Sequence, residues 1–329
     1  MRRLLAASFS LIVLLAAAAV LFVEWRIHGD HRLPSAPTTV DIAPGSSLAD
    51  IAAQLEYAGV VSSAPLFSLY VRSRRIASGI QAAEYDFPAH VPMSDIAALL
   101  AAGGRPASIW LTIPEGFTAR EIAARLASAG LGSSQSFLNV AQHSSVRIDG
   151  RESKNLEGFL FPDTYSIPRH ASAEAIAHLM TSQFMRELPA RHAQLAQRLG
   201  YTVPQIVTIA SMVEREAKVD GERRVMAGVY YNRLHAGMPL EVDATIEYAL
   251  PQHKNALSLR DLKVDSPYNT YLYSGLPPTP IANPGRKSLL AAFNPAKTDY
   301  LYYVYRGRGR HQFSRTLDEQ QAAERKYLR

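Results

Sequence analysis

Cysteine is absent from the 329-residue sequence. Its absence excludes disulfide bonds, thiolate metal sites, a cysteine nucleophile and lipidation at cysteine. A chain without thiols suits an oxidising compartment, where an unpaired thiol is a liability, but many cytosolic proteins also lack them. Cysteine usage therefore narrows the chemistry and leaves the compartment open.

Several catalytic and binding motifs are also missing. The ten histidines show no His-Glu-x-x-His spacing, and the sequence has neither a nucleophile elbow nor a P-loop. Gly307-Arg308-Gly309 lies between two strand-like segments, which is typical of a hairpin turn and not of a nucleotide-binding loop. The net charge is +6, which favours anionic surfaces or polymers, but no run of five Lys or Arg residues indicates nucleic acid. We expect no metal, no cofactor and no nucleic-acid partner.

One long apolar run occurs at the N-terminus. Leu4–Val23 is uncharged and has about the twenty residues that a bilayer-spanning helix needs. Two arginines precede the run and Glu24 follows it, which predicts a cytoplasmic N-terminus and an outward-facing remainder. The alternative is a cleaved signal peptide, because Ala17–Ala19 satisfies the small-residue cleavage pattern. Since the run is longer than a usual signal core, residues 1–24 are predicted to be a retained anchor.

A linker and a small α+β module are predicted next. Residues 25–39 are polar and contain two prolines, which is typical of a linker. Residues 40–105 combine strand-like and helix-like patterns, with Ser47 as a helix N-cap and Gly103-Gly104 as a stop signal. The expected elements are a strand at 40–42, helices at 48–55 and 65–75, a strand at 84–87 and a helix at 94–101.

The opening pattern of this module recurs at residues 110–131. Trp110–Ile113 is strand-like, Gly116 follows it, and Ile122–Ala124 belongs to an apolar helix pattern that ends near Gly130. Two copies suggest a duplicated strand–turn–helix unit, since a solenoid needs at least three repeats. Any strand–helix pair with glycine caps can have this appearance, however, and the pattern leaves both interpretations open.

The predicted catalytic domain, residues 106–329, is mainly helical with a short β-hairpin. Helices are expected at 173–188, 203–219, 221–234 and 317–328, hairpin strands at 300–305 and 311–314, and a Pro-, Tyr-, Gly- and Asn-rich loop at 265–284. The predicted fold class is α+β: an N-terminal transmembrane helix, a small module and this domain.

The helix at 203–219 carries the candidate catalytic residue, Glu214. Thr202 and Gln205 form a capping box at its start. Glu214 falls near the middle of one apolar stripe, whereas Glu216 falls on the other side. A buried carboxyl group is costly unless it is paired or protonated, and desolvation raises its pKa toward the value that a general acid needs. The stripe consists of Val203, Ile206, Val207, Ala210, Val213 and Ala217.

A structural role for Glu214 is the alternative, in an ion pair with Arg223 or Arg233. Buried ion pairs also perturb pKa values, so the helix pattern alone does not decide. The loops favour catalysis, because they offer aromatic rings and amides of the kind that line sugar-binding pockets. These loops are Leu156–Tyr165, Ser266–Tyr271 and Gly275–Pro278.

In combination, these segments resemble the YceG-like family of endolytic murein transglycosylases. The resemblance includes the anchor and a LysM-like module at residues 40–105, and it covers nearly the whole chain. Phe159 and Ala244 depart from the family pattern, which commonly has Trp and Pro there; both concern substrate contacts. The matching motifs are Leu156–Tyr165, Ala210–Glu216, Tyr231–Leu234, Gly237-Met238, Asp243–Thr245, Ser266–Pro278, Ile281–Gly285 and Asn294–Thr298.

The resemblance implies cleavage of peptidoglycan glycan strands between N-acetylmuramic acid and N-acetylglucosamine, leaving a 1,6-anhydro end. It places the chain in the bacterial inner membrane through Leu4–Val23, with the catalytic domain in the periplasm. It also implies peptidoglycan synthases (penicillin-binding proteins) as partners and a role in terminating glycan polymerisation. The family's catalytic glutamate maps to Glu214. The residues expected to bind substrate are Glu157, Tyr165, Asn232, Asp243, Tyr268, Asn269, Tyr271 and Asn283.

One carboxyl group is sufficient for such a reaction. Hydrolytic glycosidases generally need two, whereas a lytic transglycosylase uses the 6-hydroxyl of its substrate as the nucleophile. One group can then protonate the leaving oxygen and later accept the hydroxyl proton. Two alternatives stay open: a hydrolytic muramidase with Asp243 or Glu157 as second carboxylate, and a non-catalytic peptidoglycan-binding scaffold.

Overall fold

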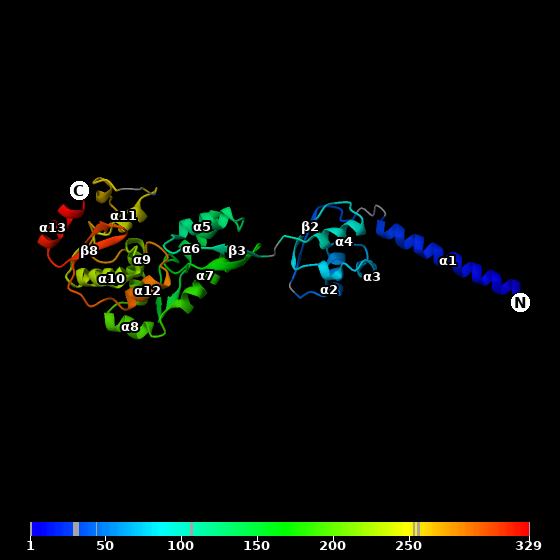
Figure 1. The fold of residues 1–329 in the computed structure, drawn as a ribbon, viewed down its shortest axis with the longest axis horizontal. Helices are drawn as coiled ribbons and strands as arrows, with labels where there is room; N and C mark the ends of the chain where they lie inside the picture. Colours follow the sequence, from blue (N-terminus) through cyan, green and yellow to red (C-terminus); the bar gives the residue numbers. More distant parts are fainter. Residues whose placement is uncertain are drawn as a thin grey trace. The chain divides into compact units, whose positions relative to one another are not determined.

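The computed structural model describes residues 2–28, 33–43, 45–105, 108–252, 254 and 257–328, and only the backbone for residues 2–13 and 19. The chain divides into two compact units, residues 1–109 and 110–329 (Figure 1). Each unit has its own hydrophobic core. Helices dominate both units, and the strands form small pairs. The predicted α+β class is therefore confirmed.

The first unit begins with helix α1 (Arg2–His28). The helix continues into the predicted linker of residues 25–39, because Ile27 packs into the core of this unit. The side chains of residues 2–13 and 19, a large part of the predicted anchor Leu4–Val23, lie outside the described residues. Among the residues that are described, no helix combines the length and hydropathy needed to cross a membrane.

A two-stranded antiparallel sheet and its helices make up the rest of the first unit. The sheet runs from Thr38 opposite Phe87 to Ile42 opposite Ala83, and Val40 and Ile42 alternate into the core. As predicted, Ser47 caps the helix that follows the first strand. The elements are β1 (Thr38–Ile42), α2 (Leu48–Tyr57), α3 (Ala64–Ser73), the 3-10 turn η1 (Ala77–Gly79), β2 (Ala83–Phe87) and α4 (Met93–Ala102).

The same order of elements opens the second unit. A strand is followed by two helices and then by the strand that pairs with the first. Thr118 and Glu121 form a capping box at the first of these helices, the counterpart of Ser47 and Asp50 in the first unit. The strand–helix–helix–strand order thus occurs twice, which favours a duplicated unit. The elements are β3 (Ser108–Thr112), α5 (Ala119–Ser128), α6 (Ser134–His143) and β6 (Thr164–Pro168), with a small hairpin of β4 (Arg147–Ile148) and β5 (Arg151–Glu152) before β6.

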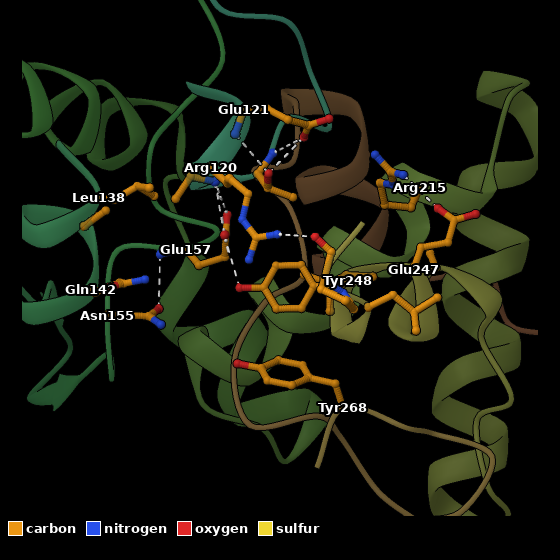
Figure 2. Close-up of a pocket in the computed structure, with 17 residues that line it drawn as sticks. Arg120, Glu121, Leu138, Gln142, Asn155, Glu157, Arg215, Glu247, Tyr248 and Tyr268 are labelled. Carbon is orange, nitrogen blue, oxygen red and sulfur yellow. Dashed lines mark hydrogen bonds and ion pairs between the residues drawn. The ribbon is translucent and has the colours of Figure 1, made fainter. Parts of the chain in front are cut away.

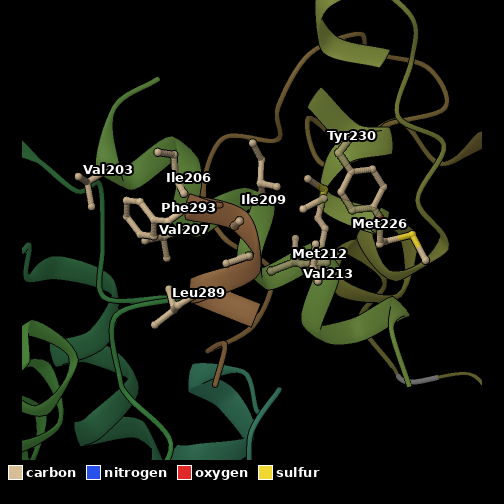
Figure 3. Close-up of a cluster of buried hydrophobic side chains, with 14 of the residues drawn as sticks. Val203, Ile206, Val207, Ile209, Met212, Val213, Met226, Tyr230, Leu289 and Phe293 are labelled. Atoms are coloured by element: carbon tan, nitrogen blue, oxygen red, sulfur yellow. The ribbon is translucent and has the colours of Figure 1, made fainter. Parts of the chain in front are cut away.

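Helix α9 (Val203–Glu216) contributes many side chains to the hydrophobic core of the second unit (Figure 3). Every residue from Ile206 to Val213 is buried, so the predicted apolar stripe and the opposite side of the helix both face core. Leu289 and Phe293 pack on one side, and Met226 and Tyr230 pack on the other. The helix ends before the predicted Val219, because the backbone of Ala217 is extended.

Further helices and a hairpin surround α9. The predicted hairpin is present and turns through Gly307, Arg308 and Gly309, all at positive φ. The predicted loop at 265–284 is free of helices and strands. The elements are α7 (Ala173–Glu187), α8 (His192–Leu199), α10 (Asp220–His235), α11 (Asp243–Ala249), the 3-10 turn η2 (Asp261–Lys263), α12 (Arg286–Phe293), β7 (Tyr302–Gly307), β8 (Arg310–Ser314) and α13 (Leu317–Tyr327).

Candidate active site

Glu214 lies in the last turn of α9, and its carboxylate is held from two sides. The backbone N–H of Gly285, at the start of α12, donates to Oε2 at 3.0 Å. The Arg223 guanidinium, from α10, donates to Oε1 at 3.3 Å. Only 6% of the Glu214 side chain is exposed. Three helices therefore meet at this carboxylate and screen it from bulk water.

Arg223 is the partner that the structural alternative for Glu214 requires. It also donates to Ser288 at 2.6 Å and to Asp220 at 3.3 Å, so it has several acceptors. Arg233 lies elsewhere and donates to backbone carbonyl oxygens and to Glu241. The ion pair is therefore real, but the pairing alone does not separate a structural from a catalytic Glu214.

The turn after β3 approaches Glu214 closely. A Cβ at Gly116 would lie 3.6 Å from Cγ of Glu214, and Gly116 has a φ of +79° that glycine adopts without strain. Backbone hydrogen bonds join Gly116 and Phe117 to Asn283 at 2.9 Å each. The neighbouring Glu115 is exposed and reaches Gly285, where a Cβ would overlap its carboxyl group.

Although the residue as a whole is exposed, partial desolvation of its carboxyl group raises the pKa of Glu115, and the nearby Glu214 raises it further, while Arg223 and Lys287 oppose the shift. The sequence interpretation did not include Glu115, because Gly116 identified this segment only as a turn. The sequence signal for Glu115 is its place directly before Gly116, a glycine at which another segment can approach the backbone closely.

A cavity of about 450 Å³ lies beside this site in the second unit (Figure 2). Arg215, the residue after Glu214, forms part of its wall and pairs with Glu247 at 2.9 Å. The rings of Tyr248 and Tyr268 pack against each other on another wall, with 4.9 Å between ring centres and an angle of 54° between their planes. Aromatic faces with a few oriented polar groups are typical of ligand pockets of this size. The remaining polar groups that line it include Arg120, Glu121, Gln142, Asn155 and Glu157.

Glu157 is buried at the edge of this cavity, and among the described residues no cation donates a hydrogen bond to it. Its carboxyl group accepts from the Ala119 N–H at 3.0 and 3.1 Å, from Asn283 Nδ2 at 2.9 Å and from the Tyr248 hydroxyl at 3.2 Å. Burial raises the pKa of Glu157 to about 7, although these donors oppose the shift. Ala119 is the first residue of α5, so Glu157 connects this helix to two other segments.

Glu216 requires a correction to the sequence interpretation, which placed it away from the buried stripe. The opposite side of α9 is also covered, and the carboxyl group of Glu216 is desolvated although the residue keeps some exposure. Burial, together with the nearby Asp243, raises its pKa to about 7. Among the described residues, no three His, Asp or Glu side chains are grouped to hold a metal ion.

Three of the predicted substrate-binding residues have accessible polar groups. Tyr268 lines the cavity, and its hydroxyl group lies 2.7 Å from that of Thr279. Tyr271 donates to the exposed Asp243 at 2.5 Å, so these two residues form a pair. The structure therefore places Tyr268 at the cavity and joins Tyr271 to Asp243 by a hydrogen bond.

Four other predicted residues hold the protein backbone. Asn283 accepts from Gly158 and Leu160, and its Nδ2 donates to Phe117 O and Glu157. The side chains that donate to main-chain carbonyl oxygens in the same manner are Asn269 to Leu262 and Val264, Asn232 to Thr298 and Tyr300, and Tyr165 to Phe161. Asn269 and Asn283 are 0% and 1% exposed, which fits structural roles.

The motif pattern agrees with comparisons to known proteins. The model of the YceG-like family matches residues 40–326, and the chain belongs to this family. An endolytic murein transglycosylase of Bacillus subtilis is 33% identical over 96% of this chain and 91% of its own length. Another, of Streptococcus pneumoniae, is 31% identical over 81% of this chain, which matches only 54% of that longer protein. The crystal structure of a yceG-like protein from Listeria monocytogenes superposes with a TM-score of 0.58 at 32% identity, covering 88% of this chain and 99% of that one.

Proposed function

We propose that this protein is an endolytic murein transglycosylase with Glu214 as its catalytic acid and base. The main support is the buried carboxyl group of Glu214, which α9, α10 and the start of α12 surround. The chain belongs to the YceG-like family. Its relatives in Bacillus and Streptococcus bear the name of this activity. The proposed product is a glycan strand that ends in 1,6-anhydro-N-acetylmuramic acid.

The chain's own groups suit a single-carboxyl reaction. Glu214 protonates the oxygen that leaves the anomeric carbon, and the substrate's 6-hydroxyl closes onto that carbon. The carboxylate then accepts the hydroxyl proton, so the enzyme returns to its starting state. The Gly285 N–H and Arg223 stabilise the carboxylate while the proton is away, since hydrogen bonds to a charged acceptor are the stronger kind.

We propose that the glycan occupies the cavity beside the site. The volume of about 450 Å³ is within the usual range for small-ligand sites, and the Tyr248–Tyr268 pair supplies an aromatic wall. Tyr268 is the predicted contact that fits this role best. The Asp243–Tyr271 pair supplies further polar groups, while Glu157, Asn269 and Asn283 hold the backbone segments beside the cavity. Asn232 and Tyr165 hold backbone carbonyl groups elsewhere in the unit.

The location follows from the proposed substrate. Murein lies outside the cytoplasm, so the catalytic unit has to act there. We propose that Leu4–Val23 anchors the chain in the inner membrane with its N-terminus in the cytoplasm, on the strength of its length and flanking charges. Nascent glycan strands and their synthases are then the proposed partners, and strand termination is the proposed role.

Digestion of purified murein by the full-length protein in detergent tests the reaction. Mass spectrometry of the new ends should show anhydro sugars, which lack one water relative to hydrolytic ends. Ends of the hydrolytic mass would instead support a muramidase, for which the extra carboxyl groups near the site are the favouring observation. Absence of cleavage by wild-type protein would support the scaffold.

A further inference from the structure

Glu115 and Glu214 approach the same backbone residue. The Gly285 N–H donates to Glu214 at 3.0 Å, and the Glu115 carboxyl group occupies the space where a Cβ of Gly285 would be. The two carboxyl groups come from segments distant in sequence, the turn after β3 and the end of α9. Their approach is thus built by the fold, through the hydrogen bonds between Gly116, Phe117 and Asn283.

The two groups have different surroundings. Glu214 accepts hydrogen bonds from Gly285 and Arg223, whereas no hydrogen bond to the Glu115 carboxyl group forms within the described part of the chain. Partial desolvation of its carboxyl group raises the pKa of Glu115, and the charge of Glu214 raises it further. Pairs of carboxyl groups in unlike environments are the usual arrangement for holding a proton ready for transfer.

We propose that Glu115 is the positioning partner of Glu214, so that the two carboxyl groups retain one proton between them at Gly285 and deliver it to the glycosidic oxygen. This inference rests on the proposed transglycosylase function. The charge of Glu214 already raises the pKa of Glu115, and like charges that interact in this way resist ionising together. The retained proton answers a need of the reaction, because Glu214 beside Arg223 has to begin the cycle protonated.

The proton and the bonds balance over one turnover. The shared proton moves to the leaving oxygen as its bond to the anomeric carbon breaks. The 6-oxygen forms a new bond to that carbon, and its proton returns to the carboxyl pair. No water, oxidant or further reactant is consumed, and the pair ends with the one proton with which it began.

Other charged groups face Glu115 and set when the proton is lost. Lys287 from α12 and Arg223 from α10 favour its ionised form, whereas Asp220 from α10 and Glu214 from α9 oppose it. Lys287 is exposed and pairs with Asp220 at 2.5 Å, so its removal also leaves Asp220 less neutralised. The pH at which activity is lost on the alkaline side should therefore respond to each of these residues in a known direction.

The experiment is a pH–rate profile of anhydro-end formation by the full-length protein and its variants. Glu115→Gln removes one charge of the pair, so the proton is released more easily. The alkaline limb of the profile should therefore move to lower pH, by on the order of one pH unit. Gly285→Ala keeps the N–H and an ordinary φ of −75° but displaces the Glu115 carboxyl group, and it should shift the limb the same way. Lys287→Gln should shift it upward. The exposed Glu56, in α2, provides a matched control as Glu56→Gln.

The outcomes separate this inference from the proposed function. Opposite shifts for Glu115→Gln and Lys287→Gln, with melting temperatures near wild type, support the pair. The role of Glu115 alone is overturned if wild type forms anhydro ends, Glu214→Gln does not, and the alkaline limbs of Glu115→Gln and Lys287→Gln stay where they are in wild type. A uniform loss of rate at every pH in Glu115→Gln would also overturn it. Failure of wild type to form anhydro ends would instead overturn the proposed function.

Discussion

Two buried glutamates of the second unit solve the same physical problem in different ways. Glu214 is neutralised by a cation, Arg223, and accepts one backbone N–H. Glu157 is surrounded by neutral donors, and burial raises its pKa to about 7. A buried carboxyl group is tolerated when it is paired or when it retains its proton. Burial by itself thus does not identify a catalytic residue.

The partners of the two groups show what each one does. Glu157 joins the start of α5 to Asn283 and to Tyr248 of α11, so its donors belong to three different segments. Glu214 is instead bordered by a close-approach glycine, Gly116, and by a second carboxyl group, Glu115. The first arrangement suits a structural junction, and the second suits proton transfer.

The largest difference between the two sites should appear in Glu214→Gln. General acid–base help is worth roughly 10²–10⁴-fold, so anhydro-product formation should fall at least that far. Stability should change little, because Arg223 keeps Asp220 and Ser288 as acceptors. Turnover and melting temperature measured on one preparation check both statements. A variant that loses stability on the order of 3–5 kcal/mol but stays active in its folded fraction would assign Glu214 to structure.

Glu157→Gln should change the pH dependence of stability and leave turnover near wild type. The folded-state pKa of about 7 is above the ordinary value of 4.5. The stability from this group is therefore fully present below pH 4.5 and is lost as the pH rises to 7, because the unfolded chain ionises first. The loss amounts to roughly 3 kcal/mol, and the glutamine variant should lack it.

Urea unfolding between pH 4 and 8 measures this slope, with Glu56→Gln as a control that keeps it. A severe loss of turnover in a well-folded Glu157→Gln would contradict the junction role and favour a hydrolytic second carboxylate.

The neighbouring residues Tyr268 and Asn269 should also differ, because one is expected to affect substrate binding and the other stability. Asn269→Ala leaves the carbonyl oxygens of Leu262 and Val264 without their donor, which should cost about 1–3 kcal/mol of stability. Tyr268→Ala opens the aromatic wall and should raise KM several-fold with a smaller change in melting temperature. Equal stability losses in both variants, with normal KM, would remove Tyr268 from substrate binding.

The sequence predicted the elements that carry strong local signals. Capping boxes begin at Ser47, Thr118 and Thr202, and the helices after them were expected or closely approximated. The short helices α8, α11 and α12 were not predicted, because seven or eight residues give too few apolar repeats.

The candidate site was only partly predictable, for a different reason. The period of α9 identified Glu214, but Glu115 belongs to a turn without period and becomes relevant only through its approach to Gly285. An Asn in a polar loop can bind a sugar hydroxyl or a backbone carbonyl group. Asn269 and Asn283 both bond backbone carbonyl groups. This follows from their positions in the fold, which the local sequence does not contain.

The smallest effect is expected for Glu216, on the side of α9 away from Glu214. Its carboxyl group has a pKa of about 7, raised by burial and then by Asp243, so its ionised form destabilises the fold above that pH. The sign is that of Glu157: stability is full below pH 4.5 and is lost as the pH rises to 7. The residue is only partly buried, so solvent screening reduces the effect to about 1 kcal/mol.

Glu216→Gln should be slightly more stable than wild type at pH 8, equal to it near pH 4.5, and unchanged in turnover. Chemical denaturation at the two pH values, with turnover measured at pH 8, checks this. A loss of activity in a stable Glu216→Gln would place a proton-transfer group on the wrong side of α9 and overturn the assignment to Glu214.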